Sequence, residues 1–258
     1  MSKLTDCFKE HKCFIPFITA GDPDLDHTVE YVLAMAEAGA DIIEIGIPFS
    51  DPTAEGPVIQ EASLRALEAG FKMENLFDAV RRIREKTDIP LIFMTYINPV
   101  FHYGYDAFFQ TCKELKVEGF ISPDVPFEEK REVAEVARKY GVDVISLISP
   151  TSEDRIEQIA RDAEGYIYVV SSMGVTGERS SFSSNLKETI ETIRKYTDLP
   201  CAVGFGISTP QQAKDMSSIS DGAIVGSAIV KIVARDGKNA APALSAYVKE
   251  MKQAVLEA

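Results

Sequence analysis

One strand–helix–strand unit decides the fold, and it lies in residues 119–148: Gly-Phe-Ile-Ser-Pro-Asp-Val-Pro-Phe-Glu-Glu-Lys-Arg-Glu-Val-Ala-Glu-Val-Ala-Arg-Lys-Tyr-Gly-Val-Asp-Val-Ile-Ser-Leu-Ile. Two apolar runs, Gly119–Pro123 and Val142–Ile148, lie on either side of an amphipathic stripe that Gly141 ends. The stripe consists of Val133, Val136, Ala137 and Tyr140, at helical spacing. The unit predicts two parallel strands joined by a crossover helix.

The same pattern repeats along the whole chain. Its strand-like runs are Phe14–Thr19, Ile42–Gly46, Leu91–Tyr96, Gly119–Pro123, Val142–Ile148, Tyr166–Val170, Ala202–Gly204 and Ala223–Gly226. Most of them are apolar throughout, which is typical of parallel strands that are covered on both faces. Eight units in 258 residues average about 32 residues each, the usual size of a strand–helix repeat.

These repeats predict an α/β fold, a single (β/α)8 TIM barrel over residues 1–258. A doubly wound open sheet is the structural alternative. The apolar residues of Leu4–Phe8 precede the first strand and predict an extra N-terminal helix that closes the floor of the barrel.

Composition excludes several classes of protein. The chain has 27 Lys and Arg against 40 Asp and Glu, so its formal net charge is −13. This balance argues against binding to nucleic acid or to an anionic membrane, because both attract clustered cations. The N-terminus has no signal-peptide pattern, and the apolar stretch Cys13–Ala20 is too short to span a bilayer. We therefore expect a cytoplasmic protein.

The cysteines and histidines indicate no metal site. Four cysteines are widely separated and form no CxxC pair, so we expect reduced residues that pack in the core. The three histidines have no spacing that suggests a pair of ligands.

Glu44 is the most informative single residue. It lies within an apolar strand that should be buried on both faces, where a carboxyl group has a raised pKa. Active sites of such barrels form at the carboxyl ends of the strands, so Glu44 is a candidate general acid or base. A structural Glu that pairs with a cation on a neighbouring strand is the alternative, but the strand cores contain no Arg or Lys.

Two loops at the carboxyl ends of strands are long enough to act as lids. They cover Ile47–Pro57 and Ser171–Ser183, and both are rich in Gly, Pro and Ser. Glu55 lies in the first loop, where a solvated acid is the simpler interpretation.

Glycines near three neighbouring strand ends suggest a phosphate site. They occur in Gly174–Gly177, Gly204–Gly206 and Gly226-Ser227, and the last pair leads into the helical run Ala228–Val233. The N–H groups of a helix N-terminus and of adjacent glycines can hold an anion without a basic patch.

Together these residues resemble the tryptophan synthase alpha chain family over nearly the whole chain. The matching motifs are Pro16-Phe-Ile-Thr-Ala-Gly-Asp-Pro23, Glu44-Ile-Gly-Ile-Pro-Phe-Ser-Asp-Pro52, Gly56-Pro-Val-Ile-Gln60, Tyr96-Ile-Asn-Pro99, Pro123-Asp-Val-Pro126, Gly174-Val-Thr-Gly177, Gly204-Phe-Gly-Ile-Ser208 and Gly226-Ser-Ala-Ile-Val230. The second motif is highly specific for the family.

The resemblance implies a lyase that cleaves indole-3-glycerol phosphate to indole and glyceraldehyde 3-phosphate in tryptophan biosynthesis. It also implies an α2β2 heterotetramer with a beta chain, to which indole passes through a tunnel. The pyridoxal phosphate of that complex is expected in the beta chain, and this chain is expected to hold no cofactor.

Site residues follow from the same resemblance. It implies catalytic roles for Glu44, Glu55 and Tyr168, with Tyr168 placed at a strand end. It implies substrate contacts by Phe17, Tyr96, Thr176, Gly177, Gly206, Gly226 and Ser227, the last four of which match phosphate-binding positions. Contacts with the beta chain are implied for Asp51, Pro52 and Asn98, and Thr176 is expected to meet the first loop when the lids close.

One residue departs from the family pattern. The family normally has Asp where this chain has Glu55, within Thr53-Ala-Glu-Gly-Pro57. The charge is kept, but the carboxylate moves by about 1 Å, and a shift of that size can cost roughly 100-fold in rate.

Two other functions stay open at this point. A different phosphate-binding barrel enzyme, such as a ribose-phosphate isomerase or an indole-glycerol phosphate synthase, would need a Lys or a Cys/Asp pair at strand ends, and this chain has neither there. Alternatively, the departure at Glu55 would suit a non-enzymatic chain that only binds and activates a beta chain.

Overall fold

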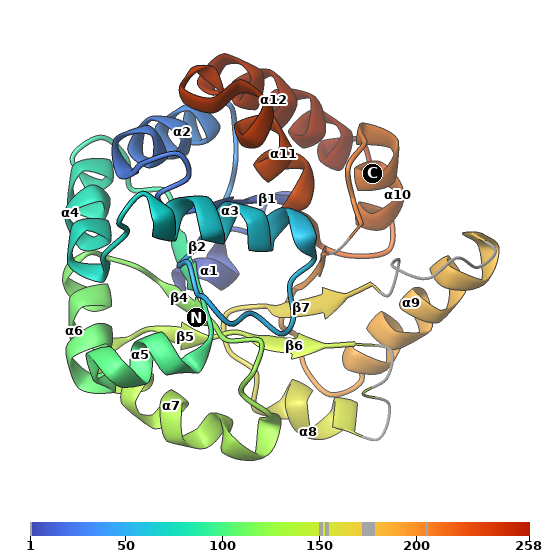
Figure 1. Cartoon of the computed structure of the whole chain (residues 1–258). Helices are drawn as coiled ribbons and strands as arrows, with labels where there is room; N and C mark the ends of the chain where they lie inside the picture. Colours follow the sequence, from blue (N-terminus) through green and yellow to red (C-terminus); the bar gives the residue numbers. More distant parts are fainter. Residues whose placement is uncertain (1, 150–151, 153–154, 172–178, 205) are drawn as a thin grey trace.

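The computed structural model describes residues 2–149, 152, 155–171, 179–204 and 206–258, with the backbone alone for residues 179–184. Within this part of the chain, parallel strands form a barrel with helices on its outside (Figure 1). The strands are β1 (Cys13–Thr19), β2 (Ile43–Gly46), β3 (Leu91–Met94), β4 (Gly119–Ile121), β5 (Asp143–Val144), β6 (Ser146–Ile148), β7 (Ile167–Val170), β8 (Cys201–Gly204) and β9 (Gly222–Val225).

One or two of the described helices follow most of the strands. They are α1 (Lys3–Asp6), α2 (Leu25–Glu37), α3 (Pro57–Glu68), α4 (Met73–Arg84), α5 (Ile97–Tyr103), α6 (Tyr105–Glu114), α7 (Phe127–Tyr140), α8 (Ile156–Arg161), α9 (Arg179–Ile193), α10 (Pro210–Ser217), α11 (Ser227–Asp236) and α12 (Ala241–Leu256).

The sheet closes through a single residue. The strand order is β5-β4-β3-β2-β1-β9-β8-β7-β6, so β5 and β6 lie at opposite ends of the ladder. Only Ile145 separates these two strands in the chain, and its N–H donates to the Phe120 carbonyl. They are therefore two halves of the one predicted strand Val142–Ile148, and the eight-stranded barrel is confirmed rather than the open sheet.

Two strands end two residues earlier than predicted. β3 ends at Met94 and β4 at Ile121, whereas the apolar runs continue to Tyr96 and Pro123. The reason is local, because Tyr96 is the N-terminal cap of α5 and Pro123 has no N–H for a ladder. The second loop was also predicted too long, since α9 already begins at Arg179.

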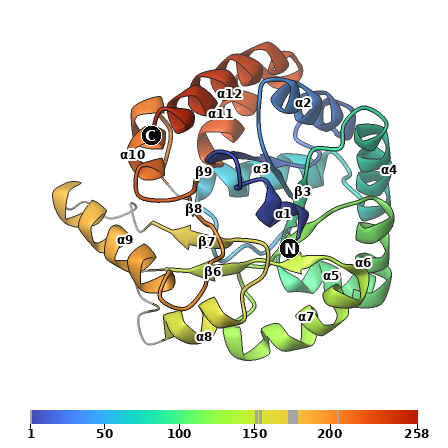
Figure 2. The same cartoon turned by 180° about the vertical axis from the view of Figure 1, so that it is seen from behind.

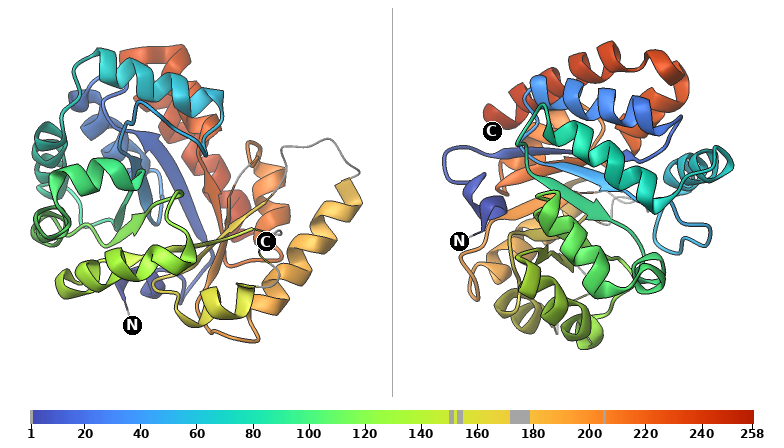
Figure 3. Two further views of the ribbon diagram at one scale, coloured as in Figure 1. Left: turned by 60° about the horizontal axis from the view of Figure 1, so that its bottom comes forward. Right: turned by 90° about the vertical axis from the view of Figure 1, so that its left-hand side faces the viewer.

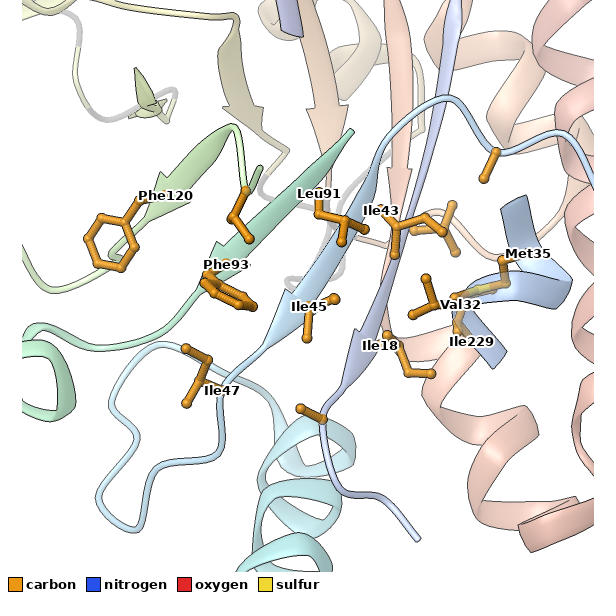
Figure 4. Packing of buried hydrophobic residues seen from close by; sticks show 14 of the residues in the cluster. Ile18, Val32, Met35, Ile43, Ile45, Ile47, Leu91, Phe93, Phe120 and Ile229 are labelled. Atoms are coloured by element: carbon orange, nitrogen blue, oxygen red, sulfur yellow. The ribbon is translucent and has the colours of Figure 1, made fainter. Parts of the chain in front are cut away.

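Alternation along the strands divides the core into an outer and an inner layer. Outward side chains such as Ile18, Ile45 and Phe93 pack against Val32 and Met35 of α2 and against other helices (Figure 4). Inward side chains fill the barrel, namely Cys13, Ile15, Ile42, Ile92, Ile121, Ile145, Tyr166, Tyr168, Ala202 and Ile224. The predicted all-apolar strands are thus explained by burial on both faces.

Helix α1 closes the floor of the barrel, as predicted. Leu4 is fully buried in the inner layer, and Thr5 donates its hydroxyl hydrogen to the Gly165 carbonyl at 2.7 Å. Figure 2 shows α1 across the end of the barrel where the strands begin. The active site must therefore form at the other end, towards which the strands run in the right-hand view of Figure 3.

The helix end predicted at Gly141 is confirmed, and other helix ends in the described part have clear caps. Gly141 takes a left-handed conformation with φ +74° after α7. Thr209 and Gln212 form a reciprocal capping box at the start of α10. Thr151 and Asp154, whose spacing in the sequence resembles that of a capping box, lie outside the described residues. No helix in the described part of the chain is both long and apolar enough to cross a membrane.

Candidate active site

Strand β2 places Glu44 inside the barrel. Ile43 and Ile45 belong to the outer layer, so Glu44 between them points inward. It pairs in register with Phe17 on β1 and with Ile92 on β3, and it is only 1% exposed. A carboxyl group is thus enclosed among apolar side chains, as the sequence predicts.

The environment of Glu44 keeps its carboxyl group protonated. Burial raises its pKa from 4.5 to about 8, although a hydrogen bond from Tyr166 opposes part of this shift. The Tyr166 hydroxyl donates to Oε1 of Glu44 at 2.9 Å. At neutral pH most Glu44 side chains are therefore neutral and can donate a proton.

Tyr166 is the functional residue that sequence reasoning missed. It lies one residue before β7, and its side chain is fully buried in the inner layer with that of Tyr168. These tyrosines are two residues apart, and residues at that spacing in a strand share one face. This spacing could have predicted that both hydroxyl groups point into the barrel. Tyr168 lies in the middle of β7 rather than at its end, and burial together with the nearby Glu44 raises its pKa well above 10.

Two glycines make room for aromatic rings at the mouth. A Cβ on Gly46 would lie 2.7 Å from a ring carbon of Phe17, and a Cβ on Gly204 would lie 2.5 Å from ring carbons of Tyr168. Neither space admits a side chain. The rings of Phe17 and Tyr168 therefore lean over Gly46 and Gly204, and the Phe17 ring comes from the residue paired with Glu44.

Tyr96 organises the loop that carries Glu55. Its hydroxyl oxygen accepts hydrogen bonds from the N–H groups of Thr53 and Ala54, at 2.8 and 2.7 Å, and donates to Oε2 of Glu55. The Phe49 ring packs 5.2 Å from the Tyr96 ring, centroid to centroid. Glu55 is therefore held in one conformation rather than freely solvated, which contradicts the simpler interpretation of this acid.

The two acids lie in different environments. Glu44 is bonded to Tyr166, and Glu55 is bonded to Tyr96, without a hydrogen bond between the acids in the described part of the chain. Burial also raises the pKa of Glu55, whereas the hydrogen bond from Tyr96 lowers it. The structure thus brings Glu44 together with Phe17 and Tyr168 in the barrel, and Glu55 with Tyr96 at its rim.

Helix α11 begins where the phosphate site was predicted. Gly226 is its N-terminal cap and provides no side-chain hydrogen bond, so the N–H groups of the first turn at Ser227 have no cap from that residue. A Cβ on Gly226 would lie 3.5 Å from the Phe17 ring, which places this helix end beside the mouth. Gly206 has φ +76°, a conformation that favours glycine. Thr176 and Gly177 lie outside the described residues.

The predicted partner contacts lie on the surface near the mouth. Asp51 and Asn98 are exposed, and Pro52 is partly exposed. Phe101 on α5, one helical turn after Asn98, is 67% exposed. An exposed aromatic ring next to predicted contact residues is typical of a protein interface.

Cysteine and metal chemistry find no support in the described residues. Burial raises the pKa of Cys7 to about 11 and also raises those of Cys13, Cys112 and Cys201, so reactive thiolates are disfavoured. Cys13, Cys112 and Cys201 pack in the core, as predicted. No group of three His, Cys, Asp or Glu side chains that could hold a metal ion occurs in the described part.

The fold and the site define a TIM-barrel enzyme with a carboxylic acid buried inside the barrel, at the level where such enzymes have their active sites. A family model described as tryptophan synthase alpha chain matches residues 4–256. The chain therefore belongs to the tryptophan synthase alpha chain family, lyases that cleave indole-3-glycerol phosphate in tryptophan biosynthesis.

Individual relatives agree with this assignment. The tryptophan synthase alpha chain of Lacticaseibacillus casei is 53% identical over 255 residues, which cover 99% of this chain and 96% of that protein. The crystal structure of tryptophan synthase subunit alpha from Legionella pneumophila has a TM-score of 0.90 and 36% identity, with both chains fully covered. A chain of the tryptophan synthase α2β2 complex from Pyrococcus furiosus has a TM-score of 0.85 and 33% identity, covering 94% of this chain and 99% of that one.

Proposed function

We propose that Glu44 is the general acid and base with which this chain cleaves indole-3-glycerol phosphate. The observation that carries the proposal is the complete burial of Glu44, which raises its pKa to about 8. A carboxyl group that is protonated at neutral pH can donate a proton to a carbon atom, and an exposed Glu is ionised under the same conditions.

The cleavage requires two proton transfers. Breaking the bond between indole C3 and the glycerol carbon leaves an electron pair on the ring, so C3 is protonated first, by Glu44. The positively charged ring then withdraws the bonding electrons while the carboxylate of Glu44 removes the proton of the adjacent glycerol hydroxyl. Indole and the aldehyde of glyceraldehyde 3-phosphate leave, and Glu44 is again protonated.

Glu55 stabilises the positive charge that the indole ring carries between the two proton transfers. A carboxylate near the ring N–H of the protonated indole lowers the energy of that state more than that of the substrate, which raises the turnover number. Tyr96 supports this role because it holds both the Glu55 side chain and the backbone of the loop.

The remaining site residues bind the substrate in this proposal. Phe17 and Tyr168 form apolar walls beside the indole ring, and the first turn of α11 at Gly226 and Ser227 holds the phosphate together with Gly206. Amides can replace cations there, which fits the net charge of −13. We propose the same task for Gly177, with Thr176 closing the second loop, both beyond the described residues.

We also propose assembly with a beta chain as an α2β2 complex, as in the Pyrococcus furiosus relative. Asp51, Pro52 and Asn98 would contact that chain, and the exposed Phe101 ring extends the same surface. Pyridoxal phosphate belongs to the beta chain in this assembly, this chain needs no cofactor of its own, and the complex acts in the cytoplasm.

An assay of indole release from indole-3-glycerol phosphate tests the proposal. The isolated chain should release indole, titration with beta chain should increase the rate, and Glu55→Ala should nearly abolish it. Glu55→Asp, which restores the usual family residue, serves as the matched control and should retain activity.

Three results would contradict parts of the proposal. Near-normal turnover of Glu55→Ala would remove Glu55 from the site. A flat response to beta chain would remove the coupling between subunits. No indole release, alone or with beta chain, would favour a chain that serves only as a binding partner.

A further inference from the structure

One buried hydroxyl group at the barrel mouth has no hydrogen-bond partner in the part of the chain that the structure describes. Thr19 ends β1, is 2% exposed, and its Oγ1 makes no hydrogen bond with any described residue. A buried hydroxyl without a partner destabilises the folded chain, so its retention calls for a reason.

The position of Thr19 places this hydroxyl above the catalytic acid. Phe14 and Ile18 belong to the outer layer, whereas Cys13 and Ile15 face inward, so Thr19 faces inward by alternation. It pairs in register with Gly46, two residues beyond the pair of Phe17 and Glu44. Thr19 therefore occupies the next layer towards the mouth.

The start of α3 lies over the same part of the mouth. Ala62 of α3 is buried against Phe17, and Val58 in the first turn packs on the same cluster. Gly56, the N-terminal cap of α3, provides no side-chain hydrogen bond. Pro57 has no N–H, and the N–H groups of Ile59 and Gln60 donate to the Gly56 carbonyl, so Val58 carries the first-turn donor without a partner among the described residues. This helix packs against β1, whose Thr19 hydroxyl can accept a hydrogen bond.

We propose that Thr19 is a positioning residue whose hydroxyl accepts a hydrogen bond from the first turn of α3 only when substrate is bound. Glu55 immediately precedes Gly56 and α3, so a hydrogen bond that fixes this helix start also fixes the second carboxylate against the substrate. The unpaired hydroxyl makes the ligand-free arrangement less stable and thereby favours the bound one. The inference rests on the function proposed above.

Thr19→Val tests the inference, because valine keeps the shape and removes the hydroxyl. The ligand-free variant should melt roughly 2 to 6 °C higher than the parent chain, since the unpaired group is gone. Its kcat/KM for indole-3-glycerol phosphate should fall about 10-fold, the effect of one lost hydrogen bond in the bound state. The thermal shift caused by a non-cleavable indole-3-alkyl phosphate should also become smaller. Thr19→Ser should restore both quantities.

Ser217→Ala is the matched control. The Ser217 hydroxyl is also buried without a partner among the described residues, but it lies at the end of α10, where the Ser217 carbonyl accepts a bond from Lys12 just before β1. This variant should melt higher as well, with unchanged kcat/KM and unchanged thermal shift.

Defined results would overturn the inference. An unchanged or lower melting temperature of ligand-free Thr19→Val would mean that the hydroxyl is already paired, for example by water. An unchanged thermal shift and kcat/KM would mean that it plays no part in the bound state. If the parent chain neither binds the analogue nor releases indole, both the proposed function and this inference fail, whereas failure in the variant alone overturns only the inference.

Discussion

The hydroxyl of Tyr166 donates a 2.9 Å hydrogen bond to Oε1 of Glu44, and both side chains are enclosed in the barrel. The bond joins residues 122 positions apart in the sequence. Glu44 lies on β2 and Tyr166 just before β7, and three strands, β1, β9 and β8, lie between β2 and β7 in the sheet. It stabilises the ionised form of Glu44, while burial stabilises the neutral form more strongly. The balance of these two effects determines the pH range in which the acid can act.

The reaction should lose rate in mild alkali. In the proposed mechanism Glu44 must be protonated to donate a proton to indole C3, and its pKa is about 8, so kcat/KM should fall as the pH rises through about 8. A pH–rate profile of indole release between pH 5 and 10 measures this limb. Constant kcat/KM up to pH 10 would exclude Glu44 as the proton donor.

Tyr166→Phe should move this limb to higher pH. Loss of the hydrogen bond removes a contribution that lowers the pKa of Glu44, so the acid should stay protonated further into alkali. The same pH–rate experiment on the variant gives the shift. Tyr103→Phe, on the outer side of the barrel wall, is the control and should leave the limb in place. A limb that moves to lower pH in Tyr166→Phe would contradict the arrangement.

Glu44→Gln should abolish activity. It should also raise the free energy of unfolding, by an amount that grows with pH. Unfolded Glu releases its proton near pH 4.5, and folded Glu44 releases it near 8, so the parent chain loses stability as the pH rises between these values. Gln cannot ionise and still accepts a bond from Tyr166. Its gain over the parent should be small at pH 5 and reach about 4 kcal/mol near pH 8.

Urea unfolding of both chains at pH 5 and pH 8 measures this gain. Glu61→Gln replaces an exposed acid on α3 and should change stability little at either pH. An equal gain for Glu44→Gln at both pH values would show that Glu44 is ionised in the folded chain.

Tyr96→Phe should impair the loop acid. Without the hydroxyl, the N–H groups of Thr53 and Ala54 and the carboxylate of Glu55 lose their common partner. We expect kcat to fall roughly 10- to 100-fold, since the carboxylate is then poorly positioned. The pKa of Glu55 should rise as well, because the bond from Tyr96 lowers it, and the acidic limb of the pH–rate profile should move to higher pH. An unchanged acidic limb would show that Glu55 need not be ionised.

Gly204→Ala should displace the Tyr168 ring. The added Cβ would lie 2.5 Å from the ring carbons, closer than real contacts allow. We expect weaker binding of the non-cleavable indole phosphate and a destabilisation of roughly 1 to 3 kcal/mol from overpacking. Calorimetric titration and thermal melting measure the two effects. Parent-like affinity would show that the ring does not line the indole site.

The eight strands and the buried position of Glu44 could be predicted because they depend on local pattern. An apolar run of five residues next to an amphipathic helix forms a buried parallel strand wherever it occurs. An acidic residue within such a strand is buried whichever face it points to, because both faces of the barrel strands are covered. Strand ends were less predictable, as at Tyr96, because capping and loop contacts compete with the ladder there.

The sequence by itself determined the barrel and the end of it that carries the site, and it made Glu44 and, through the family resemblance, Glu55 the candidate acids. The tertiary structure alone decided that Tyr166 bonds to Glu44, that Tyr96 holds Glu55, and that Thr19 has no hydrogen-bond partner among the described residues. The physical reason is that hydrophobic periodicity repeats within a few residues and can be read along the chain. A hydrogen bond between distant strands depends on register and on side-chain direction, which only the closed barrel defines.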